Sequence, residues 1–180
     1  DGKTWSDADG AADASDYGFK MTGELSGKYR CLISDGTGTE VLTNEVSVNL
    51  PTAPAITGST VRVVKDNGDN FKMFVVENSE VTSDNKELDI TVTTKNVSFN
   101  KLYFGYKDSA QDAAAEEIIK GTENKDGGYT FNFKRPESDK GKVIPLSLCK
   151  ADGTWYTNQY LWMYIPDEGI SEAVDTDISA

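Results

Sequence analysis

The sequence contains no histidine and only two cysteines, and both shortages restrict the chemistry that the chain can perform. Without histidine, the chain lacks the usual general base, the usual metal ligand and the imidazole of a catalytic triad. Cys31 and Cys149 lie far apart in predicted strands of different modules. We therefore expect two buried thiols that behave as small apolar residues, and no disulfide between them. The composition predicts a protein that is not an enzyme and has no metal site.

Basic residues and long apolar runs are also scarce. Lys and Arg number 18 against 30 Asp and Glu, which gives a formal net charge of −12. Such a surface repels nucleic acid phosphates and anionic lipid headgroups, so we expect neither as a partner. No run of about 18 apolar residues and no signal-like start is present, so no membrane contact is predicted for this fragment. The signal and the anchor of a secreted parent would lie outside it.

The 180 residues leave room for two modules, since a domain usually has about 100 to 200 residues. Pro51 and Pro54 mark the boundary, because proline ends strand pairing and favours an extended linker. We divide the chain into a first module (1–50), a linker (51–58), a second module (59–166) and an acidic tail or linker (167–180).

The first module shows strand patterns broken by small turns. Apolar and polar residues alternate over residues 17–22, 28–34 and 40–48. The turn residues Asp35 to Gly38 separate the last two patterns, which predicts a hairpin with one face inward and one face in solvent.

One spacing in this hairpin is typical of a tyrosine corner, because Tyr29 precedes Cys31 by two residues. With residues 1–5 (DGKTW) and 26–50, it resembles the second half of the immunoglobulin-like (Ig-like) repeats of bacterial surface proteins. The resemblance implies a partial Ig-like sandwich that lacks its front strands. Trp5, Tyr29 and Cys31 would then be core and corner residues without a ligand role.

The second module contains seven short strand patterns at the spacing of a β-sandwich. They cover residues 61–64, 73–81, 87–94, 98–106, 128–134, 142–150 and 154–165. One short helix is predicted over residues 109–120, because Asp108 and Ser109 offer an N-cap and Gly121 follows the end. We expect it to cover one edge or end of a sheet. The predicted fold class is all-β, a partial sandwich followed by a whole one with one short inserted helix.

Residues 66–69 (DNGD) superficially resemble a calcium-binding loop. The later bidentate glutamate that such a loop needs is missing at the required spacing. We interpret the segment as a solvated turn.

The last strand pattern carries a row of aromatic residues. In an extended strand, Leu161, Met163 and Ile165 share one side, the natural core face. The other side would carry Asn158 and four aromatic rings spaced by about 7 Å per two residues. These aromatic residues are Tyr156, Tyr160, Trp162 and Tyr164.

Three interpretations of this row compete. The rings could pack under the predicted helix or against the first module. They could form a protein-binding face, because Tyr and Trp give large contact areas and dominate binding hot spots. They could also form a porphyrin site.

The porphyrin interpretation depends on the spacing Tyr156-x-x-x-Tyr160 in the last strand of the sandwich. With the segments 73–81 (MFVVENSEV) and 101–110 (KLYFGYKDSA), this spacing resembles that of a near-iron-transporter (NEAT) domain. The resemblance spans about residues 60–166. It implies a NEAT-like sandwich in which Tyr156 ligates haem iron and Tyr160 hydrogen-bonds to it.

The preferred interpretation is a non-catalytic binding fragment of a Gram-positive or clostridial cell-surface protein, extracellular and displayed on the cell or secreted. It would engage a host protein, such as an immunoglobulin, through exposed strand and the aromatic residues Tyr156, Tyr160, Trp162 and Tyr164, with no cofactor. One alternative is haem binding through Tyr156 and Tyr160. Another is a structural stalk module that spaces other domains.

Overall fold

The protein is described by a computed structural model that covers residues 27–172 except 35–36, 39, 85 and 96–97. The chain divides into two compact units, Asp1–Leu50 and Pro51–Ala180. In the described residues of both units, strands predominate and the only helical elements are three-residue 3₁₀ turns, which confirms the all-β fold class. In the described part of the chain, no helix has the length and apolar character needed to cross a membrane.

The first unit contains an interrupted hairpin. Its strands are β1 (Gly27–Tyr29), β2 (Leu32–Ser34), β3 (Glu40–Leu42) and β4 (Val46–Val48), and β1 pairs with β4 while β2 pairs with β3. The interruption lies at Cys31 and Thr43. The Thr43 amide donates to the Cys31 carbonyl (2.9 Å), and the Cys31 amide donates to the Thr43 hydroxyl (2.8 Å). The predicted hairpin is therefore present, but a kink divides it into two ladders.

Both faces of this hairpin carry exposed apolar pairs. Leu32 lies opposite Leu42, and Ile33 lies opposite Val41. All four side chains are more than half exposed, so the expected division into one inward and one solvent face is wrong. Successive residues of a strand point to opposite faces, and here successive residues are apolar.

Cys31 is exposed, contrary to the expectation of a buried thiol, whereas Cys149 is buried as expected. Cys31 shares this exposure with the neighbouring hairpin residues Leu32 and Ile33. The expected strand over residues 17–22 and the expected core residue Trp5 lie outside the described residues.

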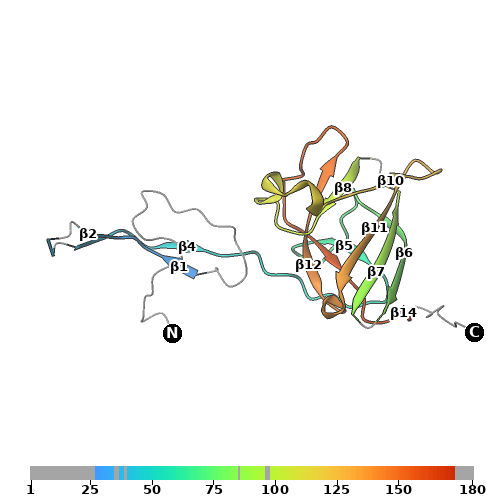
Figure 1. The fold of residues 1–180 in the computed structure, drawn as a ribbon, viewed down its shortest axis with the longest axis horizontal. Coiled ribbons are helices and arrows are strands. Elements are labelled where there is room, and N and C mark those ends of the chain that lie inside the picture. The colour runs from blue at the N-terminus through green and yellow to red at the C-terminus, as the bar shows by residue number, and fades with distance from the viewer. Residues whose placement is uncertain (1–26, 35–36, 39, 85, 96–97, 173–180) are drawn as a thin grey trace, which may run out of the picture. The chain divides into compact units, whose positions relative to one another are not determined.

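The second unit is a sandwich of two five-stranded sheets (Figure 1). The first sheet has the order β5 (Arg62–Lys65), β13 (Leu161–Tyr164), β12 (Val143–Lys150), β8 (Phe99–Tyr103), β9 (Ile118–Lys120). The second sheet has the order β10 (Thr122–Glu123), β11 (Tyr129–Pro136), β7 (Glu87–Thr94), β6 (Val76–Ser83), β14 (Ser171–Glu172). Every pair is antiparallel except β14 with β6.

The core lies between the sheets and follows the alternation of the strands. In β7, Leu88, Ile90 and Val92 are buried while the neighbouring acidic residues are exposed. Ile90 and Val92 lie opposite Phe133 and Phe131 of β11, which joins both strands in one apolar cluster. The period-2 pattern of residues 87–94 predicted this strand with its observed bounds.

The predicted helix over residues 109–120 is not formed. The segment consists of η2 (Ala110–Asp112), η3 (Ala115–Glu117) and β9. Ala113 and Ala114, between the two 3₁₀ turns, have extended backbone that interrupts helical hydrogen bonding. Ile119 instead pairs with Leu102 of β8 and packs against the core. β-Branched side chains such as those of Ile118 and Ile119 have restricted χ1 angles and pack well in strands. Burial against the sheet therefore favours a strand here.

Part of the predicted acidic tail (167–180) belongs to the sandwich. Ser171 and Glu172 form β14, parallel to Thr82 and Ser83 of β6, and Ile170 packs against the core. The expectation of a patternless tail is wrong for these residues, because Ile170 supplies an apolar contact that holds the chain against the sheet. Residues 173–180 lie outside the described part.

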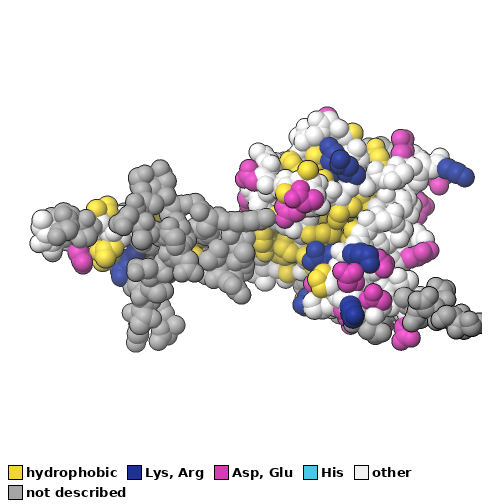
Figure 2. Space-filling view, in the orientation of Figure 1, with side chains coloured by type: hydrophobic (Ala, Val, Ile, Leu, Met, Phe, Trp, Pro, Cys, Tyr) yellow, Lys and Arg dark blue, Asp and Glu magenta, His cyan; other side chains and the backbone are white. Residues whose placement is uncertain are grey.

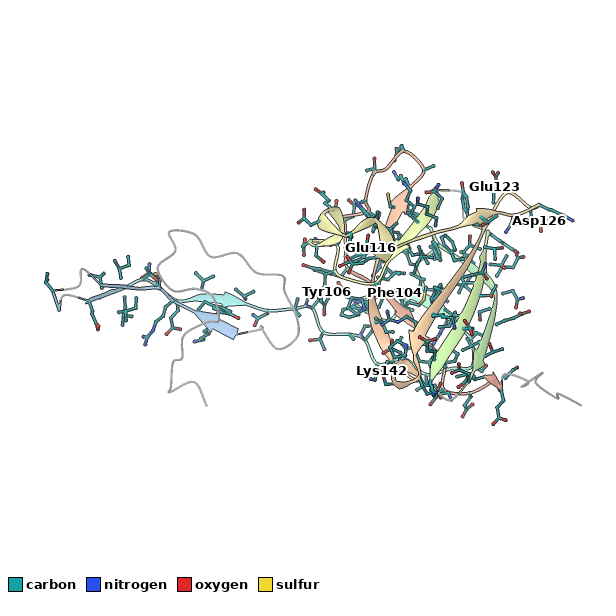
Figure 3. All side chains as sticks on the ribbon, in the orientation of Figure 1. Phe104, Tyr106, Glu116, Glu123, Asp126 and Lys142 are labelled. Atoms are coloured by element: carbon teal, nitrogen blue, oxygen red, sulfur yellow. The ribbon has the colours of Figure 1, made fainter. Side chains whose placement is uncertain are left out.

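Apolar side chains reach the surface of the second unit between basic and acidic groups (Figure 2). Phe104 and Tyr106, which follow β8, lie near one another, whereas Glu123 and Asp126 lie at the distant β10–β11 turn (Figure 3). Phe104 packs on Phe133 of the second sheet with ring centroids 5.2 Å apart. Phe104 therefore packs against the core between the two sheets.

Candidate functional site

Two of the predicted site residues, Trp162 and Tyr164, lie in β13 and are buried. Leu161 and Met163 point into the main core, whereas Trp162 and Tyr164 point to the opposite, outer face of the first sheet. Trp162 is 2% exposed and Tyr164 is 1% exposed. The expectation that both rings form an exposed face is therefore wrong.

A second buried layer lies on this outer face. Its members are Val64, Tyr103, Ala110, Ser147, Cys149, Trp162 and Tyr164. Tyr106 covers Trp162 edge-on at 5.8 Å, and the Ser147 hydroxyl donates to the Gly105 carbonyl at 2.8 Å. The segment after β8 thus covers Trp162, whereas the packing interpretation places the predicted helix over residues 109–120, or the first module, on the aromatic row.

Pro145 explains why the chain leaves the sheet after β8. It lies opposite Trp162 in β12, where it has no amide hydrogen to offer a further strand. β12 pairs with β8 only from Ser147 onward. The residues after Tyr103 therefore turn across the outer face.

Tyr160 is half-buried at the rim of this layer. Its hydroxyl donates a 2.6 Å hydrogen bond to Oδ2 of Asp108. Lys107 lies 4.6 Å from the centroid of the Tyr160 ring and donates to Oδ1 of Asp108 at 3.0 Å. Tyr106 meets the Tyr160 ring edge-on at 6.0 Å. Three consecutive residues after β8 therefore fix the orientation of one tyrosine.

Trp162 has a polar partner at the same rim. Its indole Nε1 donates to Oδ1 of Asp66 at 2.9 Å. We call the group Asp66, Tyr106, Lys107, Asp108, Tyr160 and Trp162 the Tyr160 cluster. It combines a buried indole, two half-buried phenol rings, one ammonium group and two exposed carboxylates.

The electrostatics of the cluster favour a neutral tyrosine beside an ionised aspartate. The hydrogen bond to Asp108, with smaller contributions from burial and nearby negative charge, raises the pKa of Tyr160 to about 12. The same hydrogen bond holds the pKa of Asp108 below its ordinary value. Burial raises the pKa of Tyr106. The phenol of Tyr160 is therefore harder to ionise than an ordinary tyrosine, and it remains a hydrogen-bond donor to Asp108.

Tyr164 is held separately, at the other end of β13. Its hydroxyl donates to the Gly58 carbonyl at 2.9 Å and contacts Asp167 at 3.3 Å. The Arg62 guanidinium lies 5.7 Å from the centroid of its ring. These contacts tie the segment before β5 to the segment after β13, so Tyr164 has a structural position.

Tyr156 lies on the opposite side of the first sheet from the Tyr160 cluster. Its ring packs against the core residues Phe71 (5.1 Å) and Phe99 (5.8 Å). The predicted continuous strand 154–165 is wrong, because only residues 161–164 form β13 and bends at Asn158 and Gln159 break the alternation. The spacing of Tyr156 and Tyr160 therefore does not place them on one face.

Sequence reasoning found Tyr160 and Trp162 but missed the residues around them. Tyr106, Lys107 and Asp108 lie more than 50 positions away in the sequence, and Asp66 lies in a turn. No local pattern indicates that this turn and the segment after β8 meet at β13. The segment 101–110 is part of the resemblance to a NEAT domain, but the sequence pattern indicated no site residue in it.

The carboxylates of the cluster do not form a metal-binding group. Among the described residues, no group of three or more His, Cys, Asp or Glu side chains could hold a metal ion. Asp66 and Asp69 belong to a turn after β5, as interpreted from the sequence.

No family model matches the chain, and comparisons with curated proteins and with solved structures give no significant match.

Proposed function

We propose that this chain is a non-catalytic binding fragment of a bacterial cell-surface protein, and that it engages a host extracellular protein through the Tyr160 cluster. The observation that carries the proposal is the half-exposed Tyr160 ring, which is fixed by Tyr106, Lys107 and Asp108 above buried Trp162. The binding surface is narrower than the aromatic row expected from the sequence. Trp162 and Tyr164 are buried, and Tyr156 packs against the core on the other side of the sheet, so of this row Tyr160 alone presents a partly exposed ring on this face.

The rigidity of this ring supports a binding role. A tyrosine that is already ordered loses little side-chain entropy when a partner covers it. Tyrosine is enriched among binding hot spots, which lie near the centre of an interface and are surrounded by contacts that exclude water. The buried indole beneath provides a fixed support, as a preorganised site needs.

Charge defines the kind of partner surface that fits. Asp66 and Asp108 are exposed beside the ring, and the whole chain carries a net charge of −12. A partner with basic groups opposite these carboxylates would associate faster and lose that advantage in salt. We therefore expect a host protein with a basic patch, with immunoglobulins as the first class to test.

The experiment measures binding of pooled immunoglobulin to the immobilised whole chain. We expect Tyr160→Ala to weaken binding by about tenfold or more, as truncation of a hot spot does, while Tyr160→Phe has a smaller effect because it keeps the ring. Asn132→Ala, an exposed position of the second sheet, is the matched control and should bind like the original chain.

Two results would overturn the proposal. Equal binding by Tyr160→Ala and the original chain would exclude the Tyr160 cluster as the contact surface. Absence of binding to immunoglobulin and to the other serum proteins would instead favour the structural stalk. Thermal unfolding of each variant checks that the fold is intact.

A further inference from the structure

The turn after β5 has a defined three-residue form. The Lys65 amide donates to the Asp69 carbonyl and the Gly68 amide donates to the Lys65 carbonyl, both at 2.9 Å. Gly68 has a φ of 84°, which glycine adopts without the strain that a side chain adds. Three-residue hairpin loops commonly end with such a residue.

Asn67, an exposed residue of this turn, is followed by glycine. Asn67-Gly68 is the only Asn-Gly pair in the sequence. Glycine has no Cβ to hinder its main-chain nitrogen. That nitrogen is therefore the least obstructed group that could attack an asparagine side-chain carbonyl.

Hydrogen bonds engage both reacting groups in the folded turn. The Asn67 side chain donates from Nδ2 to Oδ2 of Asp69 (2.8 Å) and accepts at Oδ1 from the Asp69 amide (3.1 Å). The Gly68 nitrogen donates to the Lys65 carbonyl. Lys65 also pairs with the Asp69 carboxylate at 3.2 Å. Attack at Asn67 therefore requires this arrangement to open.

We propose that Asn67 is a site of spontaneous deamidation, and that the Asp69 side chain sets its rate by holding the Asn67 amide in place. The Gly68 nitrogen loses its proton and bonds to Cγ of Asn67. The bond from Cγ to Nδ2 breaks, and ammonia leaves with a proton. Water then opens the cyclic imide at one of its two carbonyls, which leaves aspartate or isoaspartate at position 67.

The product changes the surroundings of the Tyr160 cluster. Either product adds a negative charge next to Asp66, and isoaspartate also adds one carbon to the main chain of the turn. Asp66 accepts the hydrogen bond of the Trp162 indole. Isoaspartate, which lengthens the turn, is therefore expected to displace Asp66 and to weaken capture. This consequence depends on the proposed function, whereas the deamidation itself does not.

The test follows intact asparagine by peptide mapping and mass spectrometry during incubation of the whole folded chain in mildly alkaline buffer. We expect Asn67 to lose its amide faster than any other asparagine, with isoaspartate detected by enzymatic methyl acceptance. Asp69→Ala should accelerate the loss about fivefold, because it removes one hydrogen bond that closes the turn.

Asp84→Ala is the matched control, since Asp84 also caps a turn, by accepting from the Lys86 and Glu87 amides, and should leave the rate at Asn67 unchanged. An unchanged rate in Asp69→Ala would overturn the proposal. So would an intact Asn67 in both folded chains while the urea-unfolded chain deamidates. Immunoglobulin binding is measured separately, so a failed capture assay leaves the deamidation result interpretable.

Discussion

The Tyr160 hydroxyl donates a 2.6 Å hydrogen bond to the Asp108 carboxylate, across a sequence separation of 52 residues. Tyr160 immediately precedes β13, and Asp108 belongs to the segment that crosses the outer face after β8. The bond therefore holds this segment over the buried Trp162 side chain. The same contact orients the partly exposed Tyr160 ring.

Asp108→Asn should lower the pKa of Tyr160. The ordinary tyrosine pKa is 10.0, and the hydrogen bond to Asp108 is the largest cause of its rise to about 12. A raised pKa in the folded state stabilises the fold fully below pH 10, and this contribution disappears as the pH rises towards 12. Absorbance titration of tyrosinate measures the change. Asp152→Asn is the control, and superimposable titration curves for Asp108→Asn and the original chain would contradict the assignment.

Arg135 and Asp139 should show measurable coupling. The Arg135 side chain donates to Oδ2 of Asp139 at 2.8 Å and lies 4.5 Å from the centroid of the Phe104 ring. Both charged side chains are largely buried, so we expect a coupling free energy of about 1–2 kcal/mol in a double-mutant cycle. The exposed pair Lys134–Glu87 is the control, with an expected coupling of about 0–0.5 kcal/mol. Equal couplings from chemical denaturation would count against this ranking.

Gly128→Ala should destabilise the second unit strongly. A Cβ atom at this position would lie 1.8 Å from the Thr94 carbonyl oxygen, so the β7 backbone would have to move, at a cost of about 2–3 kcal/mol. Gly127→Ala is the matched control. Its Cβ would meet no atom within 4 Å, but its φ of 73° costs about 1 kcal/mol. In thermal unfolding, the Tm of Gly128→Ala should lie well below that of Gly127→Ala. The reverse order would show that the described strand register is wrong.

The two thiols should react at very different rates. Cys31 is exposed, whereas Cys149 is buried and its pKa is raised by that burial. Since the thiolate is the reactive form, a thiol reagent should label one cysteine quickly in the folded chain and both after unfolding. Cys31→Ser should abolish the fast phase and Cys149→Ser should retain it. Fast labelling of Cys149 in the folded chain would contradict its placement.

Local pattern predicted β7 and the core face of β13. Alternation in residues 87–94 predicted β7 with its observed bounds, because each side chain there is either buried or exposed according to a period of two. Alternation in residues 161–165 likewise identified Leu161, Met163 and Ile165 as core residues. The acidic composition and the absence of histidine also belong to the sequence alone.

Tertiary contacts decided the remaining features of the candidate site. At the end of the helix predicted over residues 109–120, Ile118 and Ile119 instead form strand β9 and pair with β8. A sheet edge offers these side chains more burial than a short isolated helix would. The aromatic row is divided because bends before β13 send Tyr156 into the core and leave Tyr160 outside.

The sequence by itself determined the strand periodicity, the charge and the residues that β13 would carry. Only the tertiary structure decided which side chains cover them. Asp66, Tyr106, Lys107 and Asp108 reach Tyr160 and Trp162 through a turn and a chain crossing. Contacts between segments this distant depend on the path of the backbone, on which a period of two residues places no constraint.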